Sequence, residues 1–193
     1  MATIILIHGT LANPGLMWYP AAVKALKKRG HTVLAPLFPT PFRQDLETWT
    51  EEFEPYKNLL GPDTILIGHS IGATFALRIL EAAHVHIKAA FLVAGFSSNP
   101  GAQEYSSIID SFVQPPFNWQ AIKHSCQKFY VYGSDNDEFV PSKFVKELAT
   151  RLSSPVITVQ GAGHFRTKKF TQLIKDIDAL EKSQATKGKT AQK

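Results

Sequence analysis

The chain has 193 residues, enough for one folded domain with a sizeable core. Its hydrophobic content of 44% and charged content of 19% are typical of globular proteins and exclude disordered and fibrous classes. The net charge is +5, but residues 182–193 hold four lysines and no acid, which leaves +1 for residues 1–181. The basicity therefore predicts a flexible Lys-rich tail at 182–193 rather than a face that binds nucleic acid.

The first apolar run, Ile4–Ile7, is predicted to be a core strand. No basic leader or cleavage site accompanies it, and it is far too short to span a bilayer. The single cysteine, Cys126, excludes an internal disulfide and indicates a reducing compartment. We therefore expect a cytoplasmic protein with no membrane contact.

Strand-like runs alternate with helical patterns along the rest of the chain, which predicts a mostly parallel six-stranded sheet with helices on both faces. In chain order the further elements are helix 18–29, strand 31–35, a helix capped by Asp45 and reaching 60, strand 64–68, helix 73–83, strand 87–93, a short helix at 119, strand 128–132, helix 142–152, strand 156–159 and helix 167–181. Residues 95–116 are expected to be irregular. These elements fill residues 1–181, so we expect a single domain there without a large cap.

The most informative motif is Gly-x-Ser-x-Gly at residues 68–72, between a strand-like run and a predicted helix. This context is typical of the nucleophile elbow of α/β-hydrolases, in which a serine on a tight turn projects its hydroxyl above the sheet. Side chains at Gly68 and Gly72 would collide with the neighbouring strand and helix. Ser70 is therefore the candidate nucleophile.

A serine hydroxyl needs a general base, which in this fold follows later in the chain. His164 stands in Gly-Ala-Gly-His-Phe, directly after the strand 156–159, and the glycines would let this loop bring the ring close to Ser70. His84 and His86 fall at the far end of the helix that leaves the elbow. His164 is therefore the candidate base.

The acid that orients the base should lie in the loop after strand 128–132. Asp135 and Asp137 both lie there, and either could simply stabilise the turn. Asp137 precedes Val140-Pro141 by the interval seen when the acid turns inward and the next helix begins. We take Asp137 as the acid and Asp135 as the alternative.

Two backbone N–H groups are required to stabilise an oxyanion. One belongs to Ile71, which follows the nucleophile at a helix N-terminus. The other belongs to the loop after the first strand, where Gly9 allows a close approach to substrate. The sequence does not separate Thr10 from Leu11 as that donor.

Together these motifs resemble the small serine hydrolases related to retinoblastoma-binding protein 9. The resemblance rests on His8-Gly9, Trp18, the elbow 68–73, the loop 133–137, residues 163–165 and the less general stretch 115–123, and it runs from about residue 3 to about residue 181. It implies a compact α/β-hydrolase with Ser70, Asp137 and His164 as a triad and with no metal or organic cofactor. The chain has no Leu-x-Cys-x-Glu segment of the kind that docks to retinoblastoma-type proteins, so that partnership is not expected.

The predicted function is acyl hydrolysis of small substrates through an acyl-enzyme, with esters first and thioesters or amides second. Trp18 and Phe165 adjoin the loops of the predicted site, so we expect them to line the substrate pocket. The expected partner is a small ester or amide substrate, and the expected state is a monomer or weak dimer. The alternative is a protein-binding module on the same fold with no catalytic activity.

Overall fold

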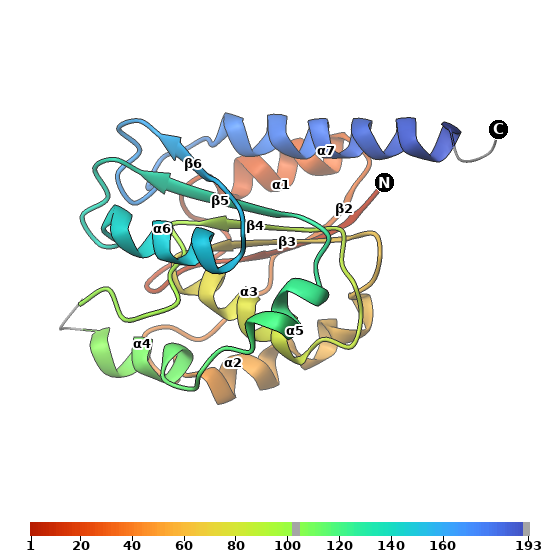
Figure 1. Ribbon diagram of the computed structural model, residues 1–193. Coiled ribbons are helices and arrows are strands. Elements are labelled where there is room, and N and C mark those ends of the chain that lie inside the picture. Colours follow the sequence, from red (N-terminus) through yellow and green to blue (C-terminus); the bar gives the residue numbers. More distant parts are fainter. Residues whose placement is uncertain (102–104, 191–193) are drawn as a thin grey trace.

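A computed structural model describes residues 1–101 and 105–190, the last six of these by backbone alone. It contains one sheet of six strands in the order β2-β1-β3-β4-β5-β6, and every neighbouring pair is parallel (Figure 1). The strands are β1 Thr3–Ile7, β2 Thr32–Leu34, β3 Thr64–His69, β4 Ala89–Val93, β5 Phe129–Ser134 and β6 Val156–Val159. The predicted sheet is confirmed. Because the strands are parallel, their carboxyl ends meet at one edge, where connecting loops build a site.

Helices cover both faces of the sheet (Figure 1). One face carries α1 (Tyr19–Lys28) and α7 (Thr171–Thr190). The other carries α2 (Leu46–Phe53), the 3₁₀ helix η1 (Glu54–Leu59), α3 (Ile71–Ala82), α4 (Ser106–Val113), α5 (Trp119–His124) and α6 (Ser142–Arg151).

Alternate side chains of each central strand enter different hydrophobic cores. Ile4 packs in the core beneath α1 and α7, whereas Ile5 packs in the core that contains α3. Both side chains are fully buried. This explains why the central strands read as continuous apolar runs rather than as an alternating pattern. The two cores fix the sheet from both faces and hold its carboxyl edge in place.

The helix predicted from Asp45 to Leu60 has two parts. Asp45 caps its start as predicted, because its carboxylate accepts a hydrogen bond of 2.8 Å from the Thr48 amide. The α-helix then ends at Phe53 and continues as η1. Pro55 explains the change, since it has no N–H to donate and its ring crowds the preceding turn.

The expectation of irregular structure from 95 to 116 is corrected by α4. Ile109 and Phe112, three residues apart, turn the same face of this helix into the core that contains α3. The sequence signal was weak because Ser106, Ser107 and Ser111 dilute the apolar pattern.

The last helix also differs from its prediction, since α7 continues beyond Glu181 to Thr190. The predicted domain boundary at 181 therefore falls within a helix. Alanine, glutamine and lysine are good helix formers, so the Lys-rich composition of this stretch is compatible with helix. Residues 191–193 of the predicted tail lie outside the described residues. Within the described part of the chain, α7 and the other helices are too short or too polar to cross a membrane.

Candidate active site

Ser70 lies at the sharp turn between β3 and α3, and its backbone adopts φ 56° and ψ −126°. A positive φ is strained for a residue with a side chain, and the surrounding structure must hold it. The Ser70 amide donates a hydrogen bond of 2.8 Å to the carbonyl of Val93 on the neighbouring strand. A Cβ on Gly72 would meet the carbonyl oxygens of Ile7 and His8, so only glycine allows α3 to pack this close to β1.

Asp137 and His164 are brought together from two loops, after β5 and β6 respectively. The Nδ1–H of His164 donates to the Asp137 carboxylate, at 2.9 Å from Oδ2 and 3.0 Å from Oδ1. Asp137 is almost fully buried, and its Oδ1 also accepts 2.9 Å hydrogen bonds from the amides of Phe139 and Val140. These bonds fix the orientation of the carboxylate and, through it, of the imidazole.

Asp135, the alternative acid, has a different partner. Its Oδ1 accepts a hydrogen bond of 2.7 Å from the amide of Gly161, and Asn136 Oδ1 accepts one of 2.8 Å from Gly163. Both bonds tie the loop after β5 to the loop that carries His164. The geometry therefore pairs His164 with Asp137, while Asp135 supports the loops.

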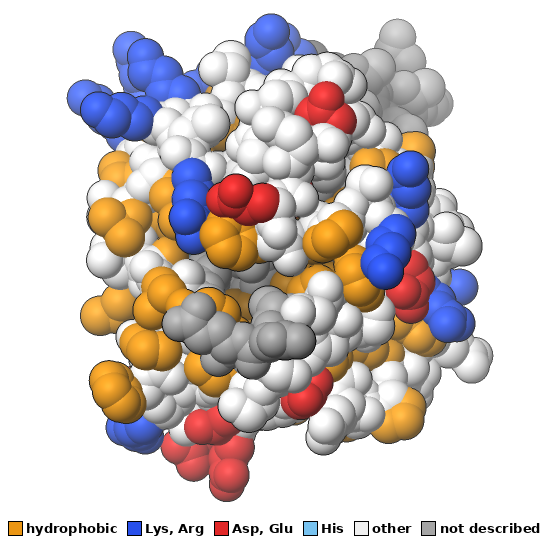
Figure 2. All heavy atoms as spheres, turned by 90° about the vertical axis from the view of Figure 1, so that its left-hand side faces the viewer, with side chains coloured by type: hydrophobic (Ala, Val, Ile, Leu, Met, Phe, Trp, Pro, Cys, Tyr) orange, Lys and Arg blue, Asp and Glu red, His pale blue; other side chains and the backbone are white. Residues whose placement is uncertain are grey.

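Ser70 and His164 border one cavity of about 100 Å³ at the carboxyl edge of the sheet. Among the described residues the Ser70 hydroxyl and the His164 ring are not hydrogen-bonded to each other. The other residues that line this cavity are Gly9, Thr10, Leu11, Met17, His69, Ile71, Phe96, Pro100, Tyr105, Ile109, Phe139, Val140 and Arg166. Hydrophobic side chains gather in the middle of this face of the molecule, and both basic and acidic side chains surround them (Figure 2).

The structure distinguishes the two candidate donors in the loop after β1. The Leu11 amide already donates to Thr40 Oγ1 at 2.8 Å. The Thr10 amide, in contrast, makes no hydrogen bond within the described residues. The Thr10 side chain is held by Gln44, whose Nε2 donates to Thr10 Oγ1 at 2.8 Å. Ile71 also borders the cavity, at the first position of α3.

A buried chain of hydrogen bonds joins this loop to the loop of His164. The Gly9 amide donates to the Tyr19 hydroxyl at 3.4 Å, which donates to His69 Nδ1 at 2.6 Å. The Nε2–H of His69 then donates to the carbonyl oxygen of His164 at 3.0 Å. Burial, followed by the proximity of His164, holds the pKa of His69 well below its usual value of 6.5, so His69 is neutral at pH 7.

The ring of His69 also packs against the ring of His164, and the two ring centroids lie 4.9 Å apart. The connection to Tyr19 was missed because no spacing pattern links residues fifty positions apart. His8 braces the loop after β1, because its ring accepts a 3.0 Å hydrogen bond from the Phe38 amide and donates one of 2.8 Å to the Gly9 carbonyl.

The prediction that Trp18 and Phe165 line the pocket is wrong. Their side chains are 0% and 1% exposed, and neither borders the cavity with Ser70. Trp18 packs edge-on against Tyr19 and Phe170 at the start of α1, and Phe165 packs against Phe170. Residues that adjoin a site loop in the sequence can turn their side chains into the core. Their position in the sequence does not reveal the direction of the side chain.

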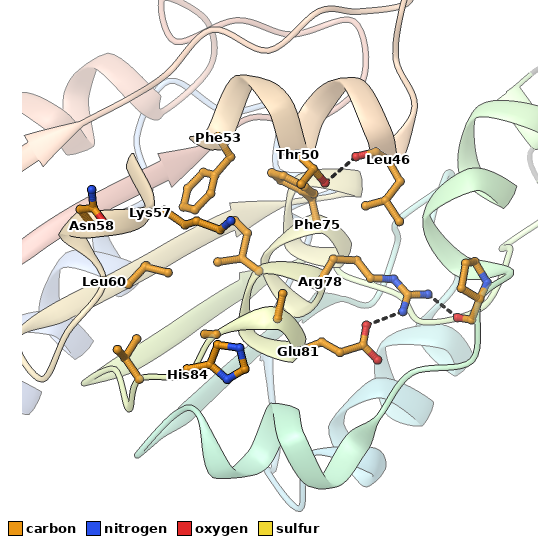
Figure 3. Close-up of a pocket in the computed structure, with 15 residues that line it drawn as sticks. Leu46, Thr50, Phe53, Lys57, Asn58, Leu60, Phe75, Arg78, Glu81 and His84 are labelled. Carbon is orange, nitrogen blue, oxygen red and sulfur yellow. Dashed lines mark hydrogen bonds and ion pairs between the residues drawn. The ribbon is translucent and has the colours of Figure 1, made fainter. Parts of the chain in front are cut away.

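A second, larger cavity of about 470 Å³ lies between α2, η1 and the C-terminal half of α3 (Figure 3). Its walls are mainly apolar, and neither Ser70 nor His164 borders it. At one end Arg78 donates to the Phe112 carbonyl at 2.9 Å, to Glu81 at 2.6 Å and to the Pro115 carbonyl. The bonds to Phe112 and Pro115 join α3 to α4 and to the segment that follows it, while the bond to Glu81 lies within α3. Arg78 therefore has a structural role.

Three or more His, Cys, Asp or Glu side chains grouped as metal ligands do not occur in the part of the chain that the structure describes. The Ser70 cavity has a different donor set, namely one hydroxyl, one imidazole and backbone amides. This set suits acyl-group chemistry.

Comparison of the chain with known proteins identifies the family to which it belongs. Residues 4–181 match the family described as serine hydrolase. The chain is 32% identical over 183 residues to YdeN of Bacillus subtilis (strain 168), covering 92% of this chain and 93% of YdeN. It is 30% identical over 173 residues to the serine hydrolase RBBP9 of Rattus norvegicus, covering 89% of each.

Solved structures show the same architecture. The crystal structure of the ydeN gene product of B. subtilis superposes with a TM-score of 0.88 at 26% identity, covering 94% of this chain and all of that one. BpoC of Mycobacterium tuberculosis H37Rv superposes with a TM-score of 0.69 at 14% identity, over 96% and 92% of the two chains, which supports the fold alone. The chain therefore belongs to the serine hydrolase family and has the α/β-hydrolase fold.

Proposed function

We propose that this protein hydrolyses esters of small acids, with Ser70 as nucleophile, His164 as general base and acid, and Asp137 as the group that orients His164. One observation carries the proposal. His164 is bound through Nδ1 to the buried Asp137 and borders the same cavity as Ser70, which is held in a strained turn. Nδ1 is occupied, so Nε2 is the nitrogen left to exchange a proton with substrate and nucleophile.

In the first half of the reaction the Ser70 Oγ attacks the ester carbonyl carbon, and His164 Nε2 takes the hydroxyl proton. The distance between the two groups closes in the substrate complex, as is common for catalytic hydrogen bonds. The buried carboxylate of Asp137 stabilises the imidazolium that forms. The amides of Ile71 and Thr10 donate to the developing oxyanion, and Thr10 rather than Leu11 is assigned because the Leu11 amide is occupied by Thr40.

The tetrahedral intermediate then breaks its bond to the alcohol oxygen, which takes the proton from His164 Nε2. This leaves the acyl group on Ser70. Water attacks the acyl carbon while Nε2 takes its proton, and the second tetrahedral intermediate expels Ser70 Oγ, which regains that proton. The products are one acid and one alcohol, and the enzyme is restored.

The size of the cavity supports short acyl groups. About 100 Å³ is below the range usual for drug-sized ligands, and Phe96, Ile109 and Phe139 give it apolar walls. Esters are placed first and amides second because an alcohol is a better leaving group than an amine. A thioester would follow the same steps.

Turnover of 4-nitrophenyl acetate and its longer-chain homologues, measured with wild type and Ser70→Ala, tests the proposal. We expect wild type to prefer the shorter esters and Ser70→Ala to lose about 10⁴-fold or more in kcat. Ser111→Ala is the matched control, since among the described residues its hydroxyl bonds to the Ile108 carbonyl in α4 and to no other group. A folded wild type without turnover of any ester or aminoacyl amide would favour the binding-module alternative.

A further inference from the structure

The segment after β6 presents two charged or titratable side chains to the Ser70 cavity. His164 and Arg166 both border the cavity, while Phe165 between them is buried in the core at φ 54°. The buried Phe165 anchors the backbone of this segment beside the cavity. The Arg166 side chain is exposed to solvent and borders the cavity, so a ligand can reach it.

The guanidinium of Arg166 is held over an aromatic ring. Its Cζ lies 4.5 Å from the centroid of Phe139, and the Phe139 ring lies 5.2 Å from the ring of His164. A cation–π contact of this kind fixes the plane of the guanidinium but leaves the N–H groups at its edge available to a ligand. An arginine edge is suited to a planar carboxylate, to which it donates two parallel hydrogen bonds.

No carboxylate balances this cation in the part of the chain that the structure describes. No Asp or Glu among the described residues lies within ion-pair distance of Arg166, and none borders the cavity. Asp137 is bound to His164 and to two backbone amides. Acidic as well as basic side chains border the hydrophobic patch on this face (Figure 2), but no acidic side chain of the described residues lines the cavity. The cavity therefore has apolar walls and one cation at its edge.

We propose that Arg166 binds a carboxylate of the substrate, so that the preferred substrates are esters that carry a negative charge near the scissile bond. The inference rests on the proposed ester hydrolysis and adds its substrate class. The charge can lie on either side of the ester: on the acyl group, as in a half-ester of a dicarboxylic acid, or on the alcohol. The two positions place the carboxylate at different distances from Ser70.

The test compares pairs of esters that differ only in charge. The alcohol arm uses 4-acetoxybenzoate and its methyl ester. The acyl arm uses mono-4-nitrophenyl glutarate and its methyl ester, with spontaneous hydrolysis subtracted. For each enzyme the measured quantity is the ratio of kcat/KM for the anionic ester to that for the neutral ester. Any effect of Arg166 on the protonation of His164 alters both members of a pair and cancels in this ratio.

In at least one arm, Arg166→Gln should lower the ratio about tenfold, the effect of losing a charge-assisted hydrogen bond at an accessible site. The arm that responds identifies the side of the ester that carries the charge. Arg166→Lys should retain part of the preference, and Arg166→Glu should reverse it. The wild-type preference should also weaken as ionic strength rises.

Lys168→Gln is the matched control, because it removes the same charge from the same segment at an exposed position outside the cavity. An equal fall of the ratio in Lys168→Gln would overturn the inference in favour of a general surface potential. Hydrolysis of the neutral esters with a ratio that Arg166→Gln leaves unchanged in both arms would also overturn it, while the proposed function would stand. Absence of hydrolysis of every ester by wild type would overturn both.

Discussion

At the scale of single residues, two histidines with adjoining rings have different surroundings. His69 is fully buried, and both of its ring nitrogens are hydrogen-bonded, one to the Tyr19 hydroxyl and the other to the His164 carbonyl. His164 has one nitrogen bound to Asp137 and borders a cavity. Burial lowers the pKa of His69, so its ring is neutral at pH 7 and keeps the single proton that it donates to the His164 carbonyl. Because both nitrogens of His69 are occupied, only His164 of this pair has a nitrogen left to exchange a proton with substrate and nucleophile.

Asp137→Asn should lower kcat by about 10⁴-fold, because an amide in this place stabilises the wrong tautomer of the imidazole. Asp135→Asn is the matched change in the same loop, and it should cost far less because Asp135 contacts the Gly161 amide and not His164. Steady-state kinetics with 4-nitrophenyl acetate distinguish the two. A larger loss of kcat in Asp135→Asn than in Asp137→Asn would show that Asp135, and not Asp137, is the acid.

Tyr19→Phe should lower kcat about tenfold with little change in KM. It removes the acceptor of the Gly9 amide and the donor to His69, and the oxyanion loop and the His164 loop lose their connection. Tyr130→Phe is the control, since the Tyr130 ring stacks on Phe91 and its hydroxyl has no hydrogen bond within the described residues. An equal effect of both variants on kcat would refute the positioning role of Tyr19.

At the scale of elements, α3 carries two separate functions along its length. Its N-terminus holds Ser70 and Ile71 at the cavity. Two turns later, Arg78 fastens the helix to α4 and to the segment that follows α4 (Figure 3). The side chain of Arg78 is 7% exposed and lies over the ring of Phe117 at 3.6 Å. Because these contacts lie away from Ser70, stability and chemistry can be changed independently in this helix.

Arg78→Met should lower the free energy of unfolding by about 3 kcal/mol, because it leaves the carbonyls of Phe112 and Pro115 without a donor and Glu81 without its cation. The kcat of the protein that remains folded should change little. Lys57→Met is the control for an exposed ion pair and should cost less than about 1 kcal/mol. Urea denaturation of the two variants measures the difference. Similar losses in the free energy of unfolding would contradict the structural role of Arg78.

Sequence predicted elements well where one local signal dominated. The apolar runs of β1 and β3 and the Gly-x-Ser-x-Gly turn could be read directly, as could the Asp45 cap. Pro55 ends α2 within the range for which the apolar pattern predicted one continuous helix. α4 was missed because its serines weaken the apolar pattern, and its burial depends on contacts with distant residues.

At the scale of the whole molecule, the parallel sheet brings the residues of the candidate site together at one edge. Ser70, Asp137 and His164 follow three different strands, and all three strands end at the same edge. Their chain order and their loops were therefore predictable without coordinates. The cavity walls were not, because side-chain direction decides them: Trp18 and Phe165 turn into the core, while Met17 and Arg166 beside them reach the cavity.

The fold should lose stability on mild acidification. Burial lowers the pKa of His8, His31 and His69, so the unfolded chain binds protons near pH 6.5 that the folded chain binds only at lower pH. The free energy of unfolding should therefore fall as pH drops below about 6.5, by at most about 1.4 kcal/mol per pH unit for each histidine.

Urea denaturation at several pH values checks this dependence, with His69→Gln as the comparison. The variant should be less stable than wild type at pH 7.5, because it disturbs the bonds to Tyr19 and the His164 carbonyl. It should lose less stability than wild type between pH 6.5 and pH 5. An unchanged slope in the variant would show that His69 is not held neutral by the fold.

The activation of Ser70 by His164 can be measured as the rate of covalent labelling by a neutral fluorophosphonate. Intact-mass spectrometry follows the labelling, and peptide mapping locates the adduct. Wild type should gain one adduct, located on Ser70, and His164→Ala should react at least about 10³-fold more slowly. An adduct on another residue, or equal labelling rates in wild type and His164→Ala, would contradict this activation.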